Sequence, residues 1–361
     1  MSSWGNAVKI SIFGESHGKG IGVVIDGLPS GVKLDMDKIL EQMARRAPGH
    51  DKASTPRLES DTPEIMSGIL NDTTTGAPLC AVIMNTNTRS QDYGNILTNP
   101  RPSHADFTGY VRYNGFNDIR GGGHFSGRLT APIVFAGAVC RQVLEQKNIK
   151  IAAHIASVGN IQDKRFNPVE ISDELMDRLA LAKFGLIDEN VEKLMRELIE
   201  DCRMSQDSIG GTIECAVTGV PVGVGSPMFY GIENVISSII FGIPAVKGIE
   251  FGSGFRGSEL RGSQNNDEFY YDGDTVKTRT NNHGGILGGI SSGMPIIFRA
   301  AIKPTASISQ QQNTVDLEKH EDSKIIIKGR HDPCIVVRAV PVIEAATAVA
   351  MVNLLAEVNK L

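Results

Sequence analysis

The chain has 361 residues, of which 41% are hydrophobic and 21% charged, and its formal net charge is −5. This composition is typical of a folded globular protein and argues against a disordered chain or a general nucleic-acid surface, which needs an excess of basic residues. We expect no apolar stretch of the roughly 18 residues that span a bilayer, and no secretory signal opens the sequence, so we expect a cytoplasmic protein.

Strands and helices are both predicted, in an order that favours an α+β fold. Short apolar or alternating runs predict strands at residues 8–13, 23–25, 79–84, 212–217, 246–251 and 325–327. Helical spacing predicts an amphipathic helix over 191–202, and more uniformly apolar segments predict buried helices over 131–146 and 342–358, the latter beginning after Pro341. The polar residues 309–324 are interpreted as a surface loop. Because no linker interrupts these elements, we predict one α+β domain over residues 1–361.

The 39 glycines form clusters, several of which contain residues that carry charge or titrate. Such clusters mark tight turns or places where the backbone comes close to a ligand. The first cluster, residues 14–18 (GESHG), follows a predicted strand and contains His17. Histidine titrates near neutral pH, so His17 is a candidate proton donor or acceptor. A surface turn is the alternative interpretation.

Two segments combine arginine with turn residues. Arg45 and Arg46 precede a Pro-Gly turn, and two adjacent guanidiniums can grip a carboxylate or a phosphate. A solvated helix end is the simpler explanation of that pair alone. Residues 101–106 (RPSHAD) place a cation, a base and an acid on a proline-stiffened loop.

Residues 120–130 (RGGGHFSGRLT) lead directly into the predicted helix that starts at residue 131. Glycines before a helix N-terminus form a natural anion cradle, because unpaired backbone N–H groups and the helix dipole both favour negative charge. A flavin phosphate or a substrate phosphate would suit this cradle. A flexible linker is the alternative, but His124, Ser126 and Arg128 interrupt the glycines at short spacing.

Other turns carry hydroxyls and cations at residues 281–293, 303–307 and 329–334, and each alone is more often a turn than a site. Residues 252–257 satisfy the spacing G-x-G-x-x-G after a predicted strand. A dinucleotide-binding fold needs a helix next, and polar, turn-rich residues follow instead, so we predict no such site. The five cysteines form no Cys-x-x-Cys pair, so neither a metal site nor a disulfide framework is predicted.

Together these segments resemble the chorismate synthase family, in the right order over nearly the whole chain. The motifs that carry the resemblance are GESHG, RR-x-PG, RSQDY at 89–93, RP-x-HAD, RGGG, DSIGG at 207–211, LRGSQNNDE from residue 260, GGILGGISSG, KPT and GRHDPC. The resemblance implies helices sandwiched between antiparallel sheets, and a homotetramer. It also implies a lyase of the shikimate pathway that uses reduced FMN to eliminate phosphate from 5-enolpyruvylshikimate 3-phosphate, giving chorismate.

The resemblance also implies roles for individual residues. The catalytic positions fall on Ser16, His17, His104, Ser126 and Asp332. Arg46 and Lys52 match positions for a pyridine nucleotide. The FMN positions fall on His124, Phe125, Ser126, Pro244, Ala245, Gly288, Lys303, Pro304, Thr305, Ala306, Ser307 and Arg330. The substrate-binding positions are Arg45, Arg101, Arg128 and Arg338.

The chain departs from the family pattern at a few of these positions. Many members read G-R-S-S-A-R-E-T where this chain has residues 123–130, so backbone contacts to FMN are expected there in place of the family's side-chain contacts. Lys52 stands where some relatives have arginine, and Ala306 replaces a hydroxyl residue.

For the mechanism, we assign His104 to the leaving phosphate and His17 to the protonation of reduced flavin, although the two roles could be exchanged. Asp332 would orient or help deprotonate near flavin N5. Two other functions stay open: an FMN-dependent flavin reductase or oxidoreductase, and a non-catalytic anion-binding protein. The sequence also leaves open whether the protein reduces FMN with NADPH or depends on an external flavin reductase.

Overall fold

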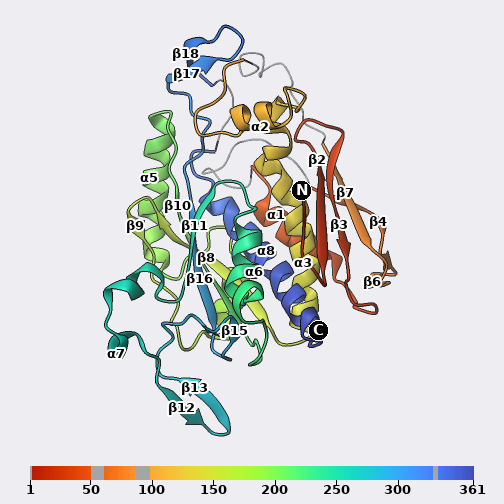
Figure 1. Cartoon of the computed structure of the whole chain (residues 1–361), viewed down its shortest axis with the longest axis vertical. Helices are drawn as coiled ribbons and strands as arrows, with labels where there is room; N and C mark the ends of the chain where they lie inside the picture. Colours follow the sequence, from red (N-terminus) through yellow and green to blue (C-terminus); the bar gives the residue numbers. More distant parts are fainter. Residues whose placement is uncertain (1, 50–60, 86–97, 328–331) are drawn as a thin grey trace.

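The computed structural model describes residues 2–49, 61–85, 98–327 and 332–361. Within them, two five-stranded antiparallel sheets enclose a layer of helices (Figure 1). The first sheet, on the right in Figure 1, contains in spatial order β1 (Ser3–Trp4), β2 (Lys9–Gly14), β3 (Gly20–Asp26), β7 (Leu79–Met84) and β4 (Pro63–Ser67). The second contains β11 (Val246–Phe251), β16 (Ile296–Ile302), β10 (Gly211–Thr218), β8 (Lys150–Val158) and β9 (Ile161–Gln162).

The helical layer consists of α1 (Met36–Arg46), α3 (Thr130–Glu145), α6 (Ile232–Ile240) and α8 (Val336–Glu357). Helices α3 and α8 pack closely because Gly137 faces Ala345, where a Cβ on the glycine would collide with the α8 backbone. The largest hydrophobic cluster joins these helices to both sheets. This arrangement confirms the predicted α+β fold with helices between antiparallel sheets.

Helix α8 corrects two sequence-based expectations. It begins at Val336, so Pro341 lies inside it rather than at its start. The proline is tolerated near the N-terminal end, because the first four N–H groups of a helix have no intrahelical partner and only one further bond is lost. The helix is also long and apolar enough to cross a membrane, contrary to expectation, but 89% of its apolar window is buried inside the protein. We therefore assign α8 to the core.

The remaining elements lie outside this three-layer core. The helices are α2 (Asp106–Arg112), α4 (Asp173–Leu181), α5 (Glu192–Met204), α7 (Gly262–Asn265) and the 3₁₀ segments Arg120–Phe125, Gly127–Leu129, Glu189–Val191, Met228–Tyr230 and Gly254–Glu259. The two-stranded hairpins are β5 (Ile69–Leu70) with β6 (Thr73–Thr74), β12 (Phe269–Asp272) with β13 (Thr275–Thr278), β14 (Ile286–Leu287) with β15 (Ile290–Ser291), and β17 (Gln312–Asp316) with β18 (Glu321–Ile325).

The β17–β18 hairpin corrects the prediction of a loop over 309–324 followed by a strand over 325–327. The strand is displaced toward the N-terminus because the polar residues of the predicted loop pair with each other. These strands are made mostly of polar residues, so they lack the apolar alternation by which a strand is usually recognised in a sequence. After β11, the 3₁₀ segment Gly254–Glu259 follows and then the four-residue helix α7.

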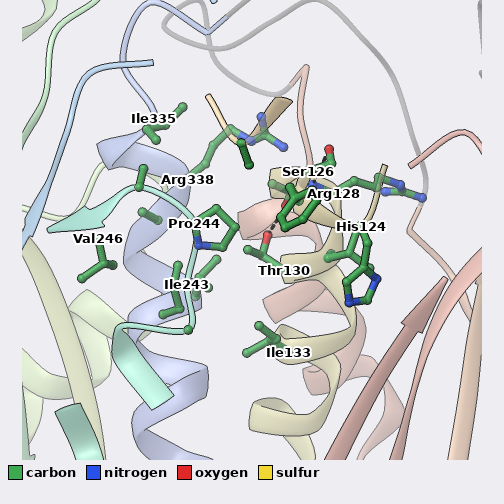
Figure 2. A pocket seen from close by; sticks show the side chains of 18 of the residues that line it. His124, Ser126, Arg128, Thr130, Ile133, Ile243, Pro244, Val246, Ile335 and Arg338 are labelled. Carbon is green, nitrogen blue, oxygen red and sulfur yellow. Dashed lines mark hydrogen bonds between the residues drawn. The ribbon is translucent and has the colours of Figure 1, made fainter. Parts of the chain in front are cut away.

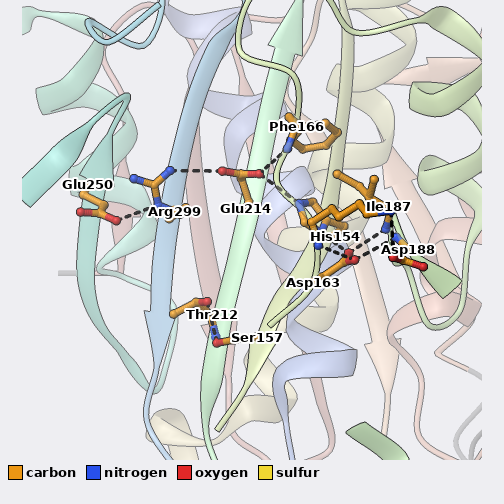
Figure 3. A network of polar contacts seen from close by, with 11 residues as sticks. His154, Ser157, Asp163, Phe166, Ile187, Asp188, Thr212, Glu214, Glu250 and Arg299 are labelled. Carbon is orange, nitrogen blue, oxygen red and sulfur yellow. Dashed lines mark hydrogen bonds and ion pairs between the residues drawn. The ribbon is translucent and has the colours of Figure 1, made fainter. Parts of the chain in front are cut away.

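A row of alternating charges crosses the outer face of the second sheet (Figure 3). Glu214 on β10 lies opposite His154 on β8 and Arg299 on β16, and Arg299 lies opposite Glu250 on β11. Both ring nitrogens of buried His154 contact carboxylates, with Nδ1 2.9 Å from Asp163 and Nε2 3.1 Å from Glu214. Burial alone would lower the pKa of His154, but the hydrogen bonds to these carboxylates raise it. The row therefore joins four strands, with His154 held between two carboxylates at one end of it.

This row predicts a pH-dependent stability. A raised folded-state pKa means that the contribution of His154 is fully present below its ordinary value of about 6.5 and is lost as the pH rises through the folded-state value. We expect His154→Gln to lower the free energy of unfolding by about 3–5 kcal/mol at pH 6, because two buried carboxylates lose their shared donor. The difference from the unsubstituted protein should shrink toward pH 9. Urea unfolding across this range measures it, and a pH-independent difference would contradict a charged His154.

Candidate active site

A pocket of about 920 Å³ opens beside the N-terminal ends of α3 and α8. It is lined by segments far apart in the sequence, and Figure 2 shows parts of several of them converging on one space. Most of the predicted site residues line it, namely His17, Arg46, Arg101, His104, His124, Phe125, Ser126, Arg128, Pro244, Ala245, Lys303, Pro304, Thr305, Ala306, Ser307, Asp332 and Arg338. Segments that are separate in sequence thus form one site.

Arg45 does not line the pocket, which corrects its predicted role in substrate binding. Its buried guanidinium forms an ion pair with Glu344 of α8, with Nη1 2.5 Å from Oε2. It also donates to the backbone carbonyls of Leu179 and Ala182. Consecutive residues on an α-helix project about 100° apart. Arg45 therefore enters the core while Arg46 lines the pocket.

Four other predicted residues are also absent from the described pocket lining. Ser16 is buried behind the lining residue His17, with its Oγ 3.2 Å from the ring Nδ1. Gly288 lies in the turn of the β14–β15 hairpin, away from the pocket. Lys52 and Arg330 lie outside the residues that the structure describes.

His104 belongs to a buried cluster with an arginine and a carboxylate. Asp106 Oδ1 lies 2.6 Å from His104 Nδ1. Arg101 donates to the same carboxylate through Nε at 2.7 Å and Nη2 at 2.8 Å, and through Nη1 to the Ser307 hydroxyl at 3.2 Å. Burial opposes ionisation, but hydrogen bonds from Arg101 and His104 hold the pKa of Asp106 well below its usual range. The carboxylate is therefore charged.

The glycine triplet of residues 121–123 packs against both predicted catalytic histidines. Gly121 adopts φ 59° and touches the His17 ring so closely that a Cβ would overlap it. Gly122 adopts φ 85° and faces His104, where a Cβ would lie 3.2 Å from Cε1 and 3.3 Å from Nε2. Positive φ favours glycine at these positions, and the absence of side chains lets both imidazoles approach the same short segment.

Asp61 joins two of the pocket arginines. Its side chain is fully buried and pairs with Arg46 through one oxygen and with Arg128 through the other. Arg46 Nε also donates to Thr130 Oγ1 at 3.1 Å, and Arg128 Nε to Asn85 Oδ1 at 3.2 Å. Asp61 thus fixes two guanidiniums that border the pocket. Sequence analysis did not select Asp61, because it lies in a separate segment and belongs to none of the motifs considered.

Arg338 and Asp332 both line the pocket and form an ion pair with each other. Arg338 Nη1 lies 2.5 Å from Asp332 Oδ2, and Arg338 Nε donates to the backbone oxygen of Arg46 at 3.0 Å. Arg338 projects from the first turns of α8 toward the pocket, as Figure 2 shows. The pair connects α8 to the end of α1 at the pocket wall.

The segment of residues 303–307 contributes a cation and a buried hydroxyl to the pocket. Lys303 donates to the Ser103 carbonyl, and burial together with the charge of Lys247 lowers the pKa of its amine. Lys247 on β11 also lines the pocket, although no sequence motif pointed to it. Among the described residues, buried Thr305 Oγ1 has no hydrogen-bond partner. A buried unpaired hydroxyl is costly, so it indicates a place for a polar ligand group.

One wall of the pocket is apolar, in contrast to these charges. Its residues are Ile10, Ile12, Ile133, Ile239, Ile243, Pro244, Ile335, Ala339 and Val342, several of which point into the space in Figure 2. An apolar wall opposite a few fixed polar groups is the usual design of a site for a cofactor or a small molecule.

Two of the residues that depart from the family pattern, His124 and Phe125, contact other parts of the chain. His124 Nδ1 lies 2.8 Å from the Gly14 carbonyl, and Nε2 lies 2.6 Å from Ser2 Oγ. Phe125 packs against Tyr113, with ring centroids 6.3 Å apart. Both residues line the pocket, and their side chains also contact Gly14, Ser2 and Tyr113 in other segments.

Comparison with known proteins gives one consistent family. The sequence pattern described as chorismate synthase matches residues 8–356. A chorismate synthase of Dehalococcoides mccartyi is 45% identical over 353 residues, which cover 98% of this chain and 96% of that protein. One of Thermococcus gammatolerans is 43% identical, over 97% of this chain and 96% of that one. A solved structure titled "Crystal Structure of Chorismate Synthase" superposes with a TM-score of 0.77 at 27% identity, covering 98% of this chain and 93% of that chain.

Proposed function

Because the chain belongs to the chorismate synthase family, lyases of aromatic amino acid biosynthesis, we propose that it converts 5-enolpyruvylshikimate 3-phosphate into chorismate and inorganic phosphate. The reaction is an anti 1,4-elimination. The carbon–oxygen bond to phosphate breaks with its electron pair on the oxygen, a ring hydrogen is lost as a proton, and a new double bond forms. Substrate and product differ only by the elements of phosphoric acid, so there is no net redox change.

One observation supports this proposal: several fixed cations and three histidines, among them His17 and His104, line a single pocket. The substrate carries a phosphate and two carboxylates, and arginine presents a planar fork of donors that matches both groups. Arg101, Arg128 and Arg338 border the pocket, each oriented by a neighbouring carboxylate. A flavin reductase would need no such cluster, which is why we favour the lyase.

The residues present fit reduced FMN as the cofactor. The unpaired Thr305 hydroxyl and the cations of Lys303 and Lys247 suit its phosphate, and the apolar wall with Pro244 suits its ring system. When bound, reduced FMN would supply transient electron density to the substrate during cleavage of the carbon–oxygen bond. The protein's own contribution is to hold both molecules and to exclude water.

Within this pocket, His104 would hold a proton toward the leaving phosphate, where a positioned donor stabilises the developing negative charge. His17 would hold a proton at the flavin. Asp332, kept in place by Arg338, would orient the group that accepts the ring hydrogen.

The decisive experiment mixes the purified protein with dithionite-reduced FMN and 5-enolpyruvylshikimate 3-phosphate without oxygen. Chorismate absorbance and phosphate release are followed together. We expect equal amounts of both products, and none when the flavin is omitted or oxidised. Binding of FMN without either product would reject the lyase.

We further propose a cytoplasmic homotetramer. Its FMN would be reduced either by NADPH bound near Arg46 or by an external flavin reductase. Anaerobic mixing of protein, FMN and NADPH distinguishes the two sources. Loss of the oxidised-flavin absorbance without added reductase would favour the first, and an unchanged spectrum the second. Light scattering of the purified protein tests the tetramer.

Thr305→Val provides a test of the cofactor site. The substitution removes a hydroxyl that has no hydrogen-bond partner among the residues that the structure describes, so the free energy of unfolding should stay the same or rise. FMN affinity should fall about two- to tenfold, because one hydrogen bond contributes roughly 0.5–1.5 kcal/mol. Thr278→Val is the matched control, since Thr278 Oγ1 is likewise buried and unpaired among the described residues but lies outside the pocket. If the unsubstituted protein, Thr305→Val and Thr278→Val all bound FMN with equal affinity, Thr305 would not be part of the site that binds the FMN phosphate.

A further inference from the structure

The two ring nitrogens of His104 have different surroundings: Nδ1 contacts Asp106 and Arg101, whereas Nε2 lies on the side of Gly122. Nδ1 is 2.6 Å from Asp106 Oδ1 and 3.0 Å from Arg101 Nη2. Arg101 Nη2 also lies 2.8 Å from that same carboxylate oxygen, so one hydrogen of the guanidinium is already committed. At 2.6 Å the ring can donate Nδ1–H to the carboxylate, whereas an Nδ1 without hydrogen would place a lone pair against the anion. The short contact favours the proton on Nδ1.

The other nitrogen, Nε2, lies on the side of Gly122, where a Cβ would come within 3.3 Å of it. The His104 side chain is 20% exposed and lines the pocket, whereas Asp106 is 6% exposed and does not line it. Asp106 thus lies behind the histidine as seen from the pocket. Because Nδ1 is engaged by Asp106, Nε2 is the ring nitrogen of His104 that can contact a bound ligand.

Asp106 is in turn held from several directions. Arg101 binds it with Nε and Nη2, and the backbone N–H of Arg101 donates to Oδ2 at 3.0 Å. Because Arg101 also borders the pocket, a single carboxylate sets the direction of one pocket histidine and one pocket arginine. A neutral amide could not accept from the arginine fork and from the imidazole in the same geometry.

We propose that Asp106 is a positioning residue of this active site, which accepts a hydrogen bond from His104 Nδ1–H and so holds the protonated ring with its second N–H, at Nε2, toward the leaving phosphate. The inference rests on the proposed function. During the elimination, the electron pair of the breaking carbon–oxygen bond goes to the phosphate oxygen, and His104 Nε2 donates its hydrogen bond, or its proton, to that phosphate. Asp106 stays ionised and stabilises the imidazolium before the proton moves. No additional oxidant or reductant takes part.

The test is a double-mutant cycle between Asp106→Asn and His104→Gln, assayed as anaerobic chorismate formation with reduced FMN. In the unsubstituted protein, we expect Asp106→Asn to lower kcat on the order of 100-fold, the usual effect of misdirecting a proton donor. In the His104→Gln background, the same change should lower kcat less than about threefold, because residues that act as a unit are not additive. Flavin affinity should be retained in all four proteins.

Several outcomes would overturn the proposal. Equal losses in both backgrounds would mean that Asp106 acts independently of His104. A loss confined to KM would mean that it acts through Arg101 and substrate binding alone. If Asp106→Asn fails to fold by circular dichroism, Asp106→Glu takes its place in the cycle, and it should recover part of kcat because it keeps the charge.

Glu200→Gln is the matched control. Glu200 also accepts an arginine fork, from Arg203 at 2.7 Å and 2.5 Å, but on α5 and outside the pocket lining. It should leave kcat unchanged, which separates the loss of any arginine–carboxylate fork from the loss of this one. If the unsubstituted protein forms no chorismate at all, the proposed function fails, and that result is distinct from an additive cycle in an active enzyme.

Discussion

Replacing His104 by alanine should lower turnover by about 10²–10⁴-fold, the usual contribution of a positioned acid or base. The ring lines the pocket with Nε2 available and Nδ1 tied to Asp106, so its removal deletes a donor without opening a large cavity in the core. Bound FMN should remain, since the groups suited to its phosphate lie on residues 303–307 and at Lys247. The measurement is single-turnover chorismate formation with reduced FMN, together with a flavin-binding titration.

His17→Ala should lower turnover by a similar factor, for a different reason. His17 contacts Ser16 and the glycine triplet, and we assign it to the flavin rather than to the phosphate. The control is His320→Asn in the turn between β17 and β18, outside the pocket, where φ is 58° and asparagine is well tolerated. That variant should keep full turnover. Wild-type turnover in both His104→Ala and His17→Ala, with FMN still bound, would reject the assignment of either histidine to the chemistry.

Most of the segments selected as candidate sites line one pocket, and each of these combines a turn with a charged or titratable residue. Such patterns are visible locally, and so are β7 and β11, whose bounds match the predicted strands. The direction in which a side chain points cannot be predicted from such a short sequence pattern. Arg45 and Arg46 look equivalent in the sequence, yet helix geometry sends one to Glu344 in the core and the other to the pocket.

The residues that sequence analysis missed act through partners that are distant in the sequence. Asp61 joins Arg46 and Arg128 across separate segments, and Lys247 acquires a role only because β11 lies beside the loop with Lys303. Asp106 was part of a noted motif, but its task appears only when its carboxylate is seen behind His104. Local patterns thus predicted many of the residues that line the pocket, whereas the tertiary fold determines which groups contact and orient them.

Gly121→Ala should lower the turnover rate, although glycine carries no reactive group. The backbone at Gly121 has φ 59°, a region in which an L-residue is less stable by roughly 1–2 kcal/mol. A methyl group there would overlap His17 and approach Ser16 Oγ to 2.8 Å, so the His17 ring has to move. Misplacing a catalytic group by about 1 Å can cost 10²-fold in rate. We expect a loss of that order in anaerobic chorismate formation, with a modest decrease in the midpoint of thermal unfolding.

The matched control is Gly262→Ala at the start of α7, where a Cβ meets nothing within 4 Å and the backbone has no positive φ. This variant should match the unsubstituted protein in both rate and thermal midpoint, because alanine is favoured over glycine in a helix. Gly121→Ala combined with His17→Ala separates strain from misplacement. If the glycine acts by positioning His17, adding Gly121→Ala to His17→Ala should change the rate little, because the colliding ring is gone. A further decrease of about 10²-fold in the rate in that background would show that the glycine is needed for the backbone conformation of residues 121–123, independently of His17.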